Sequence, residues 1–169
     1  MWPQSLLIRL PTFWMSSQIF DRYLEALDYQ KLFLLASDVQ SFAPLRPRIA
    51  DAFMTGKLDD VYRIYQVYQQ RRHERFSHAL QLLDQPFDFT AKESFDVERK
   101  GAAWPKNSAE LDELWRKSVK NDWLRLKLAG KPAADIRKTL DKRYETLLKG
   151  INEWKNEDVF SIYLNAYTR

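Results

Sequence analysis

Apolar residues between positions 58 and 83 recur at intervals of three and four, and this spacing predicts one long amphipathic helix. The stretch contains no Gly or Pro, and Asp59 and Asp60 near its start suit the positive end of a helix dipole. At about 1.5 Å per residue the helix would be about 39 Å long, so shorter helices are expected to pack along it. Its apolar face comprises Val61, Ile64, Tyr65, Tyr68, Phe76, Ala79, Leu80 and Leu83.

The same spacing predicts five further helices, which are separated by Gly, Pro and polar residues. They cover residues 16–27, 48–55, 108–129, 133–150 and 156–169. Along residues 108–129 the apolar face comprises Leu111, Leu114, Trp115, Val119, Trp123 and Leu126. Along residues 133–150 it comprises Ile136, Leu140, Tyr144, Leu147 and Leu148.

Polar residues at the helix starts are expected to cap free backbone N–H groups. Ser16 or Ser17 would cap the first helix, and Asn107 or Ser108 would cap the helix over residues 108–129, with Glu110 as capping partner. Gly56 and Gly130 are expected at helix ends, where a left-handed residue terminates the helix.

Two connecting stretches have a distinct composition. Residues 32–36 form a short apolar run, interpreted as buried helix or loop rather than strand, and Ser37 and Asp38 after it are expected to form another cap. Residues 85–106 are rich in turn-forming residues and in aromatics, with room for a short extended segment. The aromatics Phe87, Phe89, Phe95 and Trp104 are expected to hold this connection against the helices.

Composition supports an all-α fold: a single domain of about six to eight helices around the two long helices 58–83 and 108–129. The 169 residues are 45% hydrophobic and include only 4 Gly, which disfavours a turn-rich β fold. The chain has no Cys, so disulfides, thiolate metal sites and cysteine nucleophiles are excluded. No apolar run approaches the roughly 18 residues of a membrane span, and residues 1–10 lack the pattern of a secretory signal.

The net charge of +4 is unevenly distributed. Residues 99–155 contain 15 Lys and Arg against 8 Asp and Glu, a surplus of +7, so the rest of the chain carries −3. One interpretation is a free-standing basic module that binds nucleic acid or an acidic protein partner. The other is a set of solvated helix faces, which the alternation of charge along the helices favours.

Candidate catalytic and metal-binding residues are few. His73, Glu74 and His78 resemble the zinc-protease pattern H-E-x-x-H, but the histidines are five residues apart. Five residues turn an α-helix by about 500°, so the rings would lie about 140° apart and could not share one zinc ion. Ser118 with Lys117 or Lys120 could form a Ser–Lys nucleophile, but no oxyanion loop accompanies them.

Other polar and aromatic groups have structural explanations. The carboxylate pairs 59–60, 112–113 and 157–158 lie near predicted helix starts, where capping accounts for them. Trp104, Trp115 and Trp123 could stack on bases, but the eight-residue spacing of the last two is typical of a buried helix face. No Gly-rich phosphate loop is present, and the sequence predicts no cofactor and no metal.

Six blocks of sequence carry a family resemblance when taken together. They are IFDRYLEALDY with LASDV, GKLDDVYRIY with RRHERF, PFDFT, WPKNSAELDELWR, LKLAGK with IRKTLDKRY, and EDVFSIYLNAYTR. In this order they resemble the N-terminal helical region of the tail-specific protease family (Prc or Tsp), the carboxyl-terminal processing peptidases. The resemblance covers residues 16–169 as one helical N-terminal domain and leaves residues 1–15 unmatched.

The resemblance implies a periplasmic serine peptidase that degrades proteins from apolar C-termini. In that family a PDZ domain holds the tail and a Ser–Lys dyad performs the chemistry, and both lie outside the region that this chain matches. No catalytic residue is therefore assigned here, and the expected role is a non-catalytic scaffold or interaction domain. Its expected partners are the PDZ and peptidase region and an adaptor protein.

The last predicted helix, residues 157–169, is apolar on more than one side. Such a helix needs cover on most sides, and in a complete family member the following domain would supply part of it. The expected interaction surface is therefore Val159, Phe160, Ile162, Tyr163 and Tyr167. Self-association through residues 157–169, or fraying of this segment in dilute solution, is predicted, and light scattering paired with Phe160→Glu or Tyr163→Glu tests it.

Overall fold

The computed structural model describes the backbone of residues 9–168 and the side chains of residues 14–168. The fold is all-α, as predicted, and no strand occurs within this range. The longer helices are α2 (Arg9–Leu27), α5 (Asp59–Leu82), α6 (Ser108–Leu128), α7 (Ala133–Gly150) and α8 (Asn156–Thr168). The shorter ones are α3 (Ala36–Ser41), α4 (Asp51–Thr55) and the 3-10 turns η1 (Ala43–Leu45) and η2 (Ile151–Glu153).

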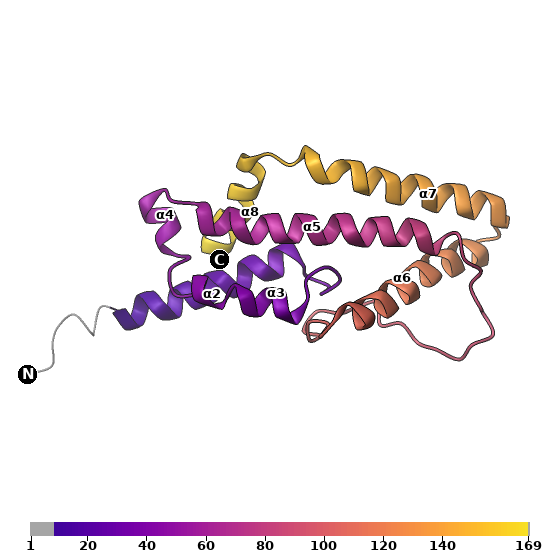
Figure 1. Ribbon diagram of the computed structural model, residues 1–169, viewed down its shortest axis with the longest axis horizontal. Coiled ribbons are helices and arrows are strands. Elements are labelled where there is room, and N and C mark those ends of the chain that lie inside the picture. Colours follow the sequence, from indigo (N-terminus) through magenta and orange to yellow (C-terminus); the bar gives the residue numbers. More distant parts are fainter. Residues whose placement is uncertain (1–8, 169) are drawn as a thin grey trace, which may run out of the picture.

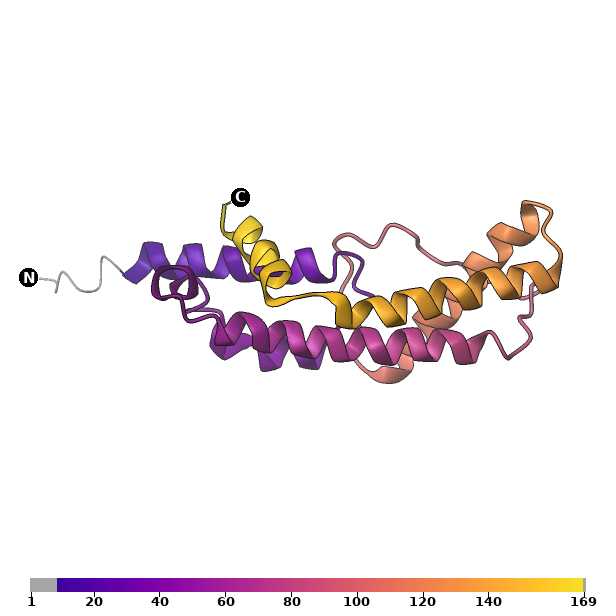
Figure 2. The ribbon, with the colours of Figure 1, turned by 90° about the horizontal axis from the view of Figure 1, so that it is seen from above.

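Helix α5 runs along most of the molecule and connects its two halves (Figure 1). Its first half packs with α2, α4 and α8 around one cluster of buried side chains, which includes Phe20, Tyr23, Ile64 and Tyr163. Its second half packs with α6 and α7 around another, which includes Phe76. Figure 2 shows the same division from above, with α7 lying alongside α5 and α8 crossing α2. Two long helices were expected at the centre of the fold. Helix α5 contributes buried side chains to both clusters, and α6 contributes to the second cluster alone.

The segment between α2 and α3 joins the two clusters. Asp28 at the end of α2 is buried, and its carboxylate accepts the backbone N–H groups of residues 32, 33 and 34 at 2.9–3.0 Å. These bonds hold Phe33 against Tyr68, Phe76 and Trp115, with ring centroids 5.5–5.6 Å apart. The run at residues 32–36 is therefore not a strand. It forms an ordered connection, the link between the two clusters, whose conformation is fixed by the hydrogen bonds to Asp28.

Several predicted helix ends are confirmed. Asn107 caps α6 by accepting the backbone N–H of Glu110 at 2.9 Å, and Glu110 in return accepts the N–H of Lys106. Gly56 has a φ of 68°, in the left-handed region, where a side chain would be strained. Asp38 accepts the N–H of Leu35 at the start of α3 and pairs with Arg71 of α5 through two bonds of 2.9 Å.

Four sequence expectations were wrong. Helix α2 begins at Arg9 rather than at residue 16, and the predictions for residues 1–8 lie outside the described residues. Ser16 is consequently not a cap: it is buried in the middle of α2, where its hydroxyl donates to the carbonyl of Arg46 and accepts from the N–H of Ala50. Ser37 is exposed within α3, where Asp38 makes the capping bond. The helix expected over residues 48–55 is only five residues long.

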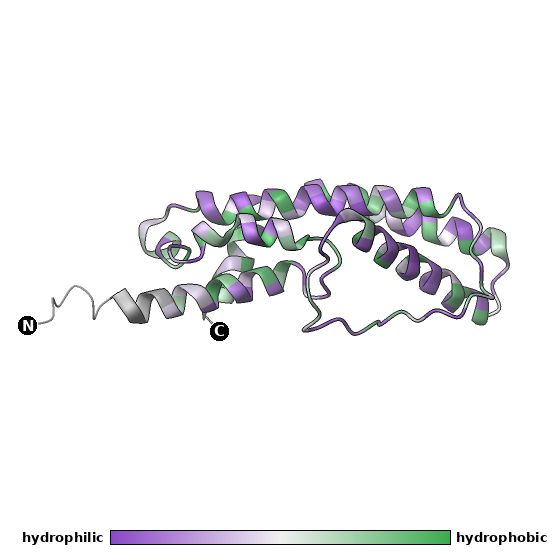
Figure 3. Ribbon diagram, turned by 60° about the horizontal axis from the view of Figure 1, so that its bottom comes forward, coloured by the Kyte–Doolittle hydropathy of each residue, from purple (hydrophilic) through white to green (hydrophobic). Residues whose placement is uncertain are grey.

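Polar and apolar residues alternate in bands along every long helix (Figure 3). Most predicted apolar faces are buried accordingly, but Leu147 of α7 is exposed, because Leu148 beside it faces the second cluster instead. Among the described helices, none combines the length and the apolar character that crossing a membrane requires.

Candidate interaction surfaces

The predicted surface on α8 is largely buried, and this expectation was wrong for Val159 and Tyr163. Both side chains belong to the first cluster, and Tyr163 is 0% exposed. The ring of Tyr163 packs edge-on against Tyr23 with centroids 6.0 Å apart, and its hydroxyl donates to the carbonyl of Ile49 at 2.7 Å. The domain itself therefore covers the side of α8 that was expected to need a partner.

The remaining three residues of that surface are partly buried. Phe160, Ile162 and Tyr167 pack against the same cluster, and Tyr167 stacks on Phe53 of α4 with centroids 4.6 Å apart. No large apolar side chain of the described part of α8 is exposed. The self-association predicted through α8 thus loses its physical premise, although a substitution such as Phe160→Glu still tests it.

Large apolar side chains are exposed on several other elements, and on α4 two of them are neighbours in the sequence. Phe53 and Met54 of α4 are 43% and 77% exposed, and Trp14 of α2 is also exposed. Because α4 has only five residues, it is too short to bury both of its faces. One side of the Phe53 ring covers Tyr167, and the other side of this ring faces water. Sequence periodicity missed this surface because the α4 pattern is shorter than two turns.

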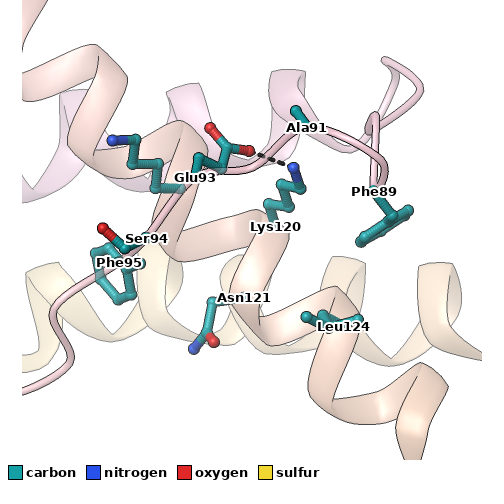
Figure 4. Close-up of a pocket in the computed structure, with 9 residues that line it drawn as sticks. Phe89, Ala91, Glu93, Ser94, Phe95, Lys120, Asn121 and Leu124 are labelled. Carbon is teal, nitrogen blue, oxygen red and sulfur yellow. Dashed lines mark hydrogen bonds and ion pairs between the residues drawn. The ribbon is translucent and has the colours of Figure 1, made fainter.

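A second surface feature is a groove of about 260 Å³ between α6 and residues 89–95 of the long connection (Figure 4). Phe89 and Phe95 of the connection and Asn121 and Leu124 of α6 are among the residues that line it. Phe87 also packs on Trp123, with ring centroids 5.9 Å apart. Three of the four aromatics predicted to hold the connection therefore do so along α6, and the fourth, Trp104, packs against the first cluster.

An ion-pair cluster anchors the connection to α6. The Glu93 carboxylate accepts from the guanidinium of Arg116 and from the amine of Lys120, and Lys120 also donates to the carbonyl of Asp88. Figure 4 shows Glu93 and Lys120 pointing toward one another across the groove. Hydrogen bonds from Arg116 and then Lys120 lower the pKa of the Glu93 carboxyl to about 2.

We expect the connection to detach from α6 in acid as Glu93 is protonated. Because the folded pKa lies below the ordinary value near 4.5, the contribution of Glu93 is present above that value and is lost as the pH falls through about 2. NMR resonances of the Phe95 ring should shift across this window in the native chain. In Glu93→Gln the ring should already show the detached shifts at neutral pH, and a native-like spectrum there would contradict the anchor.

The candidate Ser–Lys nucleophile does not have a free amine in this arrangement. Lys120 is buried and donates to Glu93 and Asp88, and Lys117 lies 3.8 Å from the Glu113 carboxylate. The partners of both amines are thus carboxylate and carbonyl oxygens of other residues, and not the hydroxyl of Ser118. These lysines therefore have structural partners rather than a catalytic geometry.

The two histidines do not form a shared metal site. Helix α5 is unbroken through both, so their five-residue spacing directs them to different sides, with His73 exposed and His78 partly buried. The His78 ring lies 3.9 Å from the Asp112 carboxylate, and burial lowers its pKa. No cluster of three or more metal-ligating side chains is found in the part of the chain that the structure describes.

Basic residues of α6 and α7 are interleaved with acidic ones. Arg137 pairs with Asp141 and Asp84, and Arg143 lies 3.3 Å from Asp122. Of the tryptophans considered for base stacking, Trp115 is buried, and Trp104 and Trp123 are partly buried against the two clusters. This arrangement favours solvated helix faces over a nucleic-acid surface.

Comparison with known proteins gives consistent matches. A family model described as the tail specific protease N-terminal domain matches residues 14–169. The tail-specific protease of Haemophilus influenzae is 35% identical over 155 residues, which is 91% of this chain and 22% of that protein. The chain thus spans about a fifth of the length of this relative.

Proposed function

The chain belongs to the family of tail-specific protease N-terminal domains, and from this membership we propose that it is a non-catalytic helical scaffold of such a protease. The parent family is a family of proteases, of which this chain represents the N-terminal domain. Under the proposal, the Ser–Lys chemistry and the recognition of apolar C-termini belong to other regions of a periplasmic enzyme.

The observation that carries the proposal is the contrast between paired polar groups and exposed apolar ones. The amines of Lys117 and Lys120 are held by carboxylates, whereas Phe53 and Met54 present apolar surface to water beside α8. Exposed apolar residues grouped on a surface are typical of a docking site. We assign to this α4 surface the contact with the catalytic region, in place of the buried stripe on α8.

A chimeric protease tests this assignment. The chain would replace the N-terminal domain of the Haemophilus influenzae relative, and cleavage of a protein with an apolar C-terminal tail would be measured. We expect the chimera to cleave, the isolated chain to be inactive, and Phe53→Glu with Met54→Glu to reduce the activity of the chimera at least about tenfold, since each large apolar side chain contributes about 1.5–3 kcal/mol when buried.

Leu147→Glu, an exposed position on α7, is the matched control and should leave the activity unchanged. Turnover by the isolated chain that survives repurification and is lost in Ser118→Ala would overturn the non-catalytic role. Full activity of the Phe53 and Met54 variant would overturn the docking surface.

A further inference from the structure

The turn between α6 and α7 presents an apolar surface to water. Leu128, the last residue of α6, is 78% exposed, and no large apolar side chain of the described residues is more exposed. The exposed residues that follow it are small, apart from one lysine: Ala129, Gly130, Lys131, Pro132, Ala133 and Ala134. Residues 128–134 are named the α6–α7 tip below. The tip is therefore apolar except for a single amine.

The α6–α7 tip is ordered although it is exposed. The backbone N–H of Gly130 donates to the carbonyl of Lys127 at 3.0 Å, and that of Lys131 donates to the carbonyl of Leu126 at 3.2 Å. Gly130 has a φ of 81°, the left-handed conformation that ends a helix. Figures 1 and 2 show the turn at one end of the long axis of the molecule, opposite the start of α2. A flat partner can therefore approach the tip without meeting the rest of the domain.

Cations without carboxylate partners surround the tip. Arg125 and Lys127 precede Leu128 on α6, Lys131 lies in the turn, and all three side chains belong to exposed residues. Among the described residues none of the three forms an ion pair, and the amine of Lys127 lies 4.7 Å from the centroid of the Phe89 ring instead. The domain itself therefore does not neutralise these charges.

The local balance of charge is positive. Residues 123–140 contain five Lys and Arg but only one acidic residue, Asp135. One of the five, Arg137, is paired with Asp84 and Asp141. The remaining four cations thus outnumber the single carboxylate, and the end of the molecule that carries Leu128 attracts anions.

An apolar end among exposed cations fits a surface that is apolar inside and anionic at its border. A bilayer with anionic headgroups has this structure, because apolar side chains enter the acyl boundary while cations stay at the headgroups. Lysine and arginine side chains are long enough to keep their charges at headgroup level while the turn itself goes deeper. Protein docking sites depend instead on bulky side chains that fill shaped pockets, and the small residues around Leu128 offer little such shape.

We propose that the α6–α7 tip docks on the surface of a bilayer that contains anionic lipids. Leu128 enters the acyl boundary, and the cations of Arg125, Lys127 and Lys131 lie at the headgroups. One leucine and three cations make a weak contact that salt screens. The tip lies far from α4 (Figure 1), so this proposal does not depend on the proposed function.

Co-sedimentation with vesicles at low ionic strength tests the role of charge. The chain should bind vesicles of equal parts phosphatidylglycerol and phosphatidylcholine at least about tenfold more tightly than vesicles of phosphatidylcholine alone, because only the former attract the cations. Lys127→Glu with Lys131→Glu should weaken this binding at least about tenfold. Lys57→Glu with Lys142→Glu changes the net charge equally at exposed positions away from the tip, so it should weaken binding less than about threefold. All four positions are exposed, and both variants are expected to fold.

The absence of Cys from the chain allows a second measurement. A dye whose emission depends on its surroundings is attached at Leu128→Cys or, as the matched control, at Met54→Cys. The two native side chains are 78% and 77% exposed, so both dyes start in water. On the anionic vesicles the emission of the dye at position 128 should shift to the blue because it leaves water, and that of the dye at position 54 should not change.

A chain that does not bind the anionic vesicles at low ionic strength overturns the proposal. Binding that the two charge variants weaken equally also overturns it, because general attraction by the net charge would then explain the result. A blue shift at position 54 without one at position 128 would place the contact on α4 instead. Binding through the tip cations without a blue shift at position 128 would contradict the entry of Leu128 into the lipid.

Discussion

Replacing Phe76 with alanine is expected to lower the free energy of unfolding by about 3–5 kcal/mol, the usual range for a buried aromatic. The Phe76 side chain is 5% exposed on α5 and belongs to the second cluster. Its ring packs against Phe33 at 5.5 Å and Trp115 at 5.7 Å, so it contacts the link between the clusters as well as α6. Truncation would leave a cavity where these three elements meet.

Denaturant unfolding of the native chain and of Phe76→Ala measures this change. Leu147→Ala is the control for a large apolar residue on a helix surface, and it should change the free energy of unfolding by less than about 0.5 kcal/mol. A change below about 1 kcal/mol for Phe76→Ala would show that the second cluster does not depend on this ring.

Residues 58–83, 108–129 and 133–150 illustrate what the sequence could predict. Their observed counterparts α5, α6 and α7 begin and end within a residue or two of the expected positions. The reason is local: long amphipathic periodicity selects the helix, and Asn107 and Gly130 define the two ends of α6 through a hydrogen bond and a left-handed backbone angle within a few residues. Local patterns of this kind need no knowledge of the rest of the fold.

Tyr163 and Ser16 illustrate what the sequence could not predict. Both were interpreted from their own helices, yet Tyr163 binds the carbonyl of Ile49 and Ser16 bonds residues 46 and 50. These partners lie far away along the chain, on other elements. Whether an apolar stripe is covered depends on such partners, and for this reason α8 was mistaken for an exposed surface.

The groove on α6 was predictable only in part. The aromatics of residues 85–106 indicated that the connection is held in place, and Phe87, Phe89 and Phe95 confirm it. The ionic anchor was missed, because Glu93 is far from Arg116 and Lys120 along the chain and no pattern relates them. From the sequence alone, a carboxylate of a connecting segment that forms ion pairs cannot be distinguished from one that faces water.

The second large effect is expected at Asp28, where alanine should lower the free energy of unfolding by about 3–5 kcal/mol, because each backbone donor left unpaired inside a protein costs about 1–3 kcal/mol. Asp28 is 2% exposed, and its two carboxylate oxygens accept three consecutive backbone N–H groups. Without them, those donors would be left unpaired in a link that is partly shielded from water. The link would then lose the conformation that places Phe33 between α5 and α6.

Asp21→Ala is the matched control, because Asp21 lies on the same helix but is exposed and pairs with Arg46 at the surface. A surface ion pair contributes at most about 1 kcal/mol, so this variant should unfold almost like the native chain. NMR adds a second measurement: in Asp28→Ala the indole N–H signal of Trp115 should shift, because this indole donates to the carbonyl of Leu32 in the same link. Equal unfolding free energies for the two variants, with an unchanged Trp115 signal, would show that Phe33 and its ring contacts hold the link without Asp28.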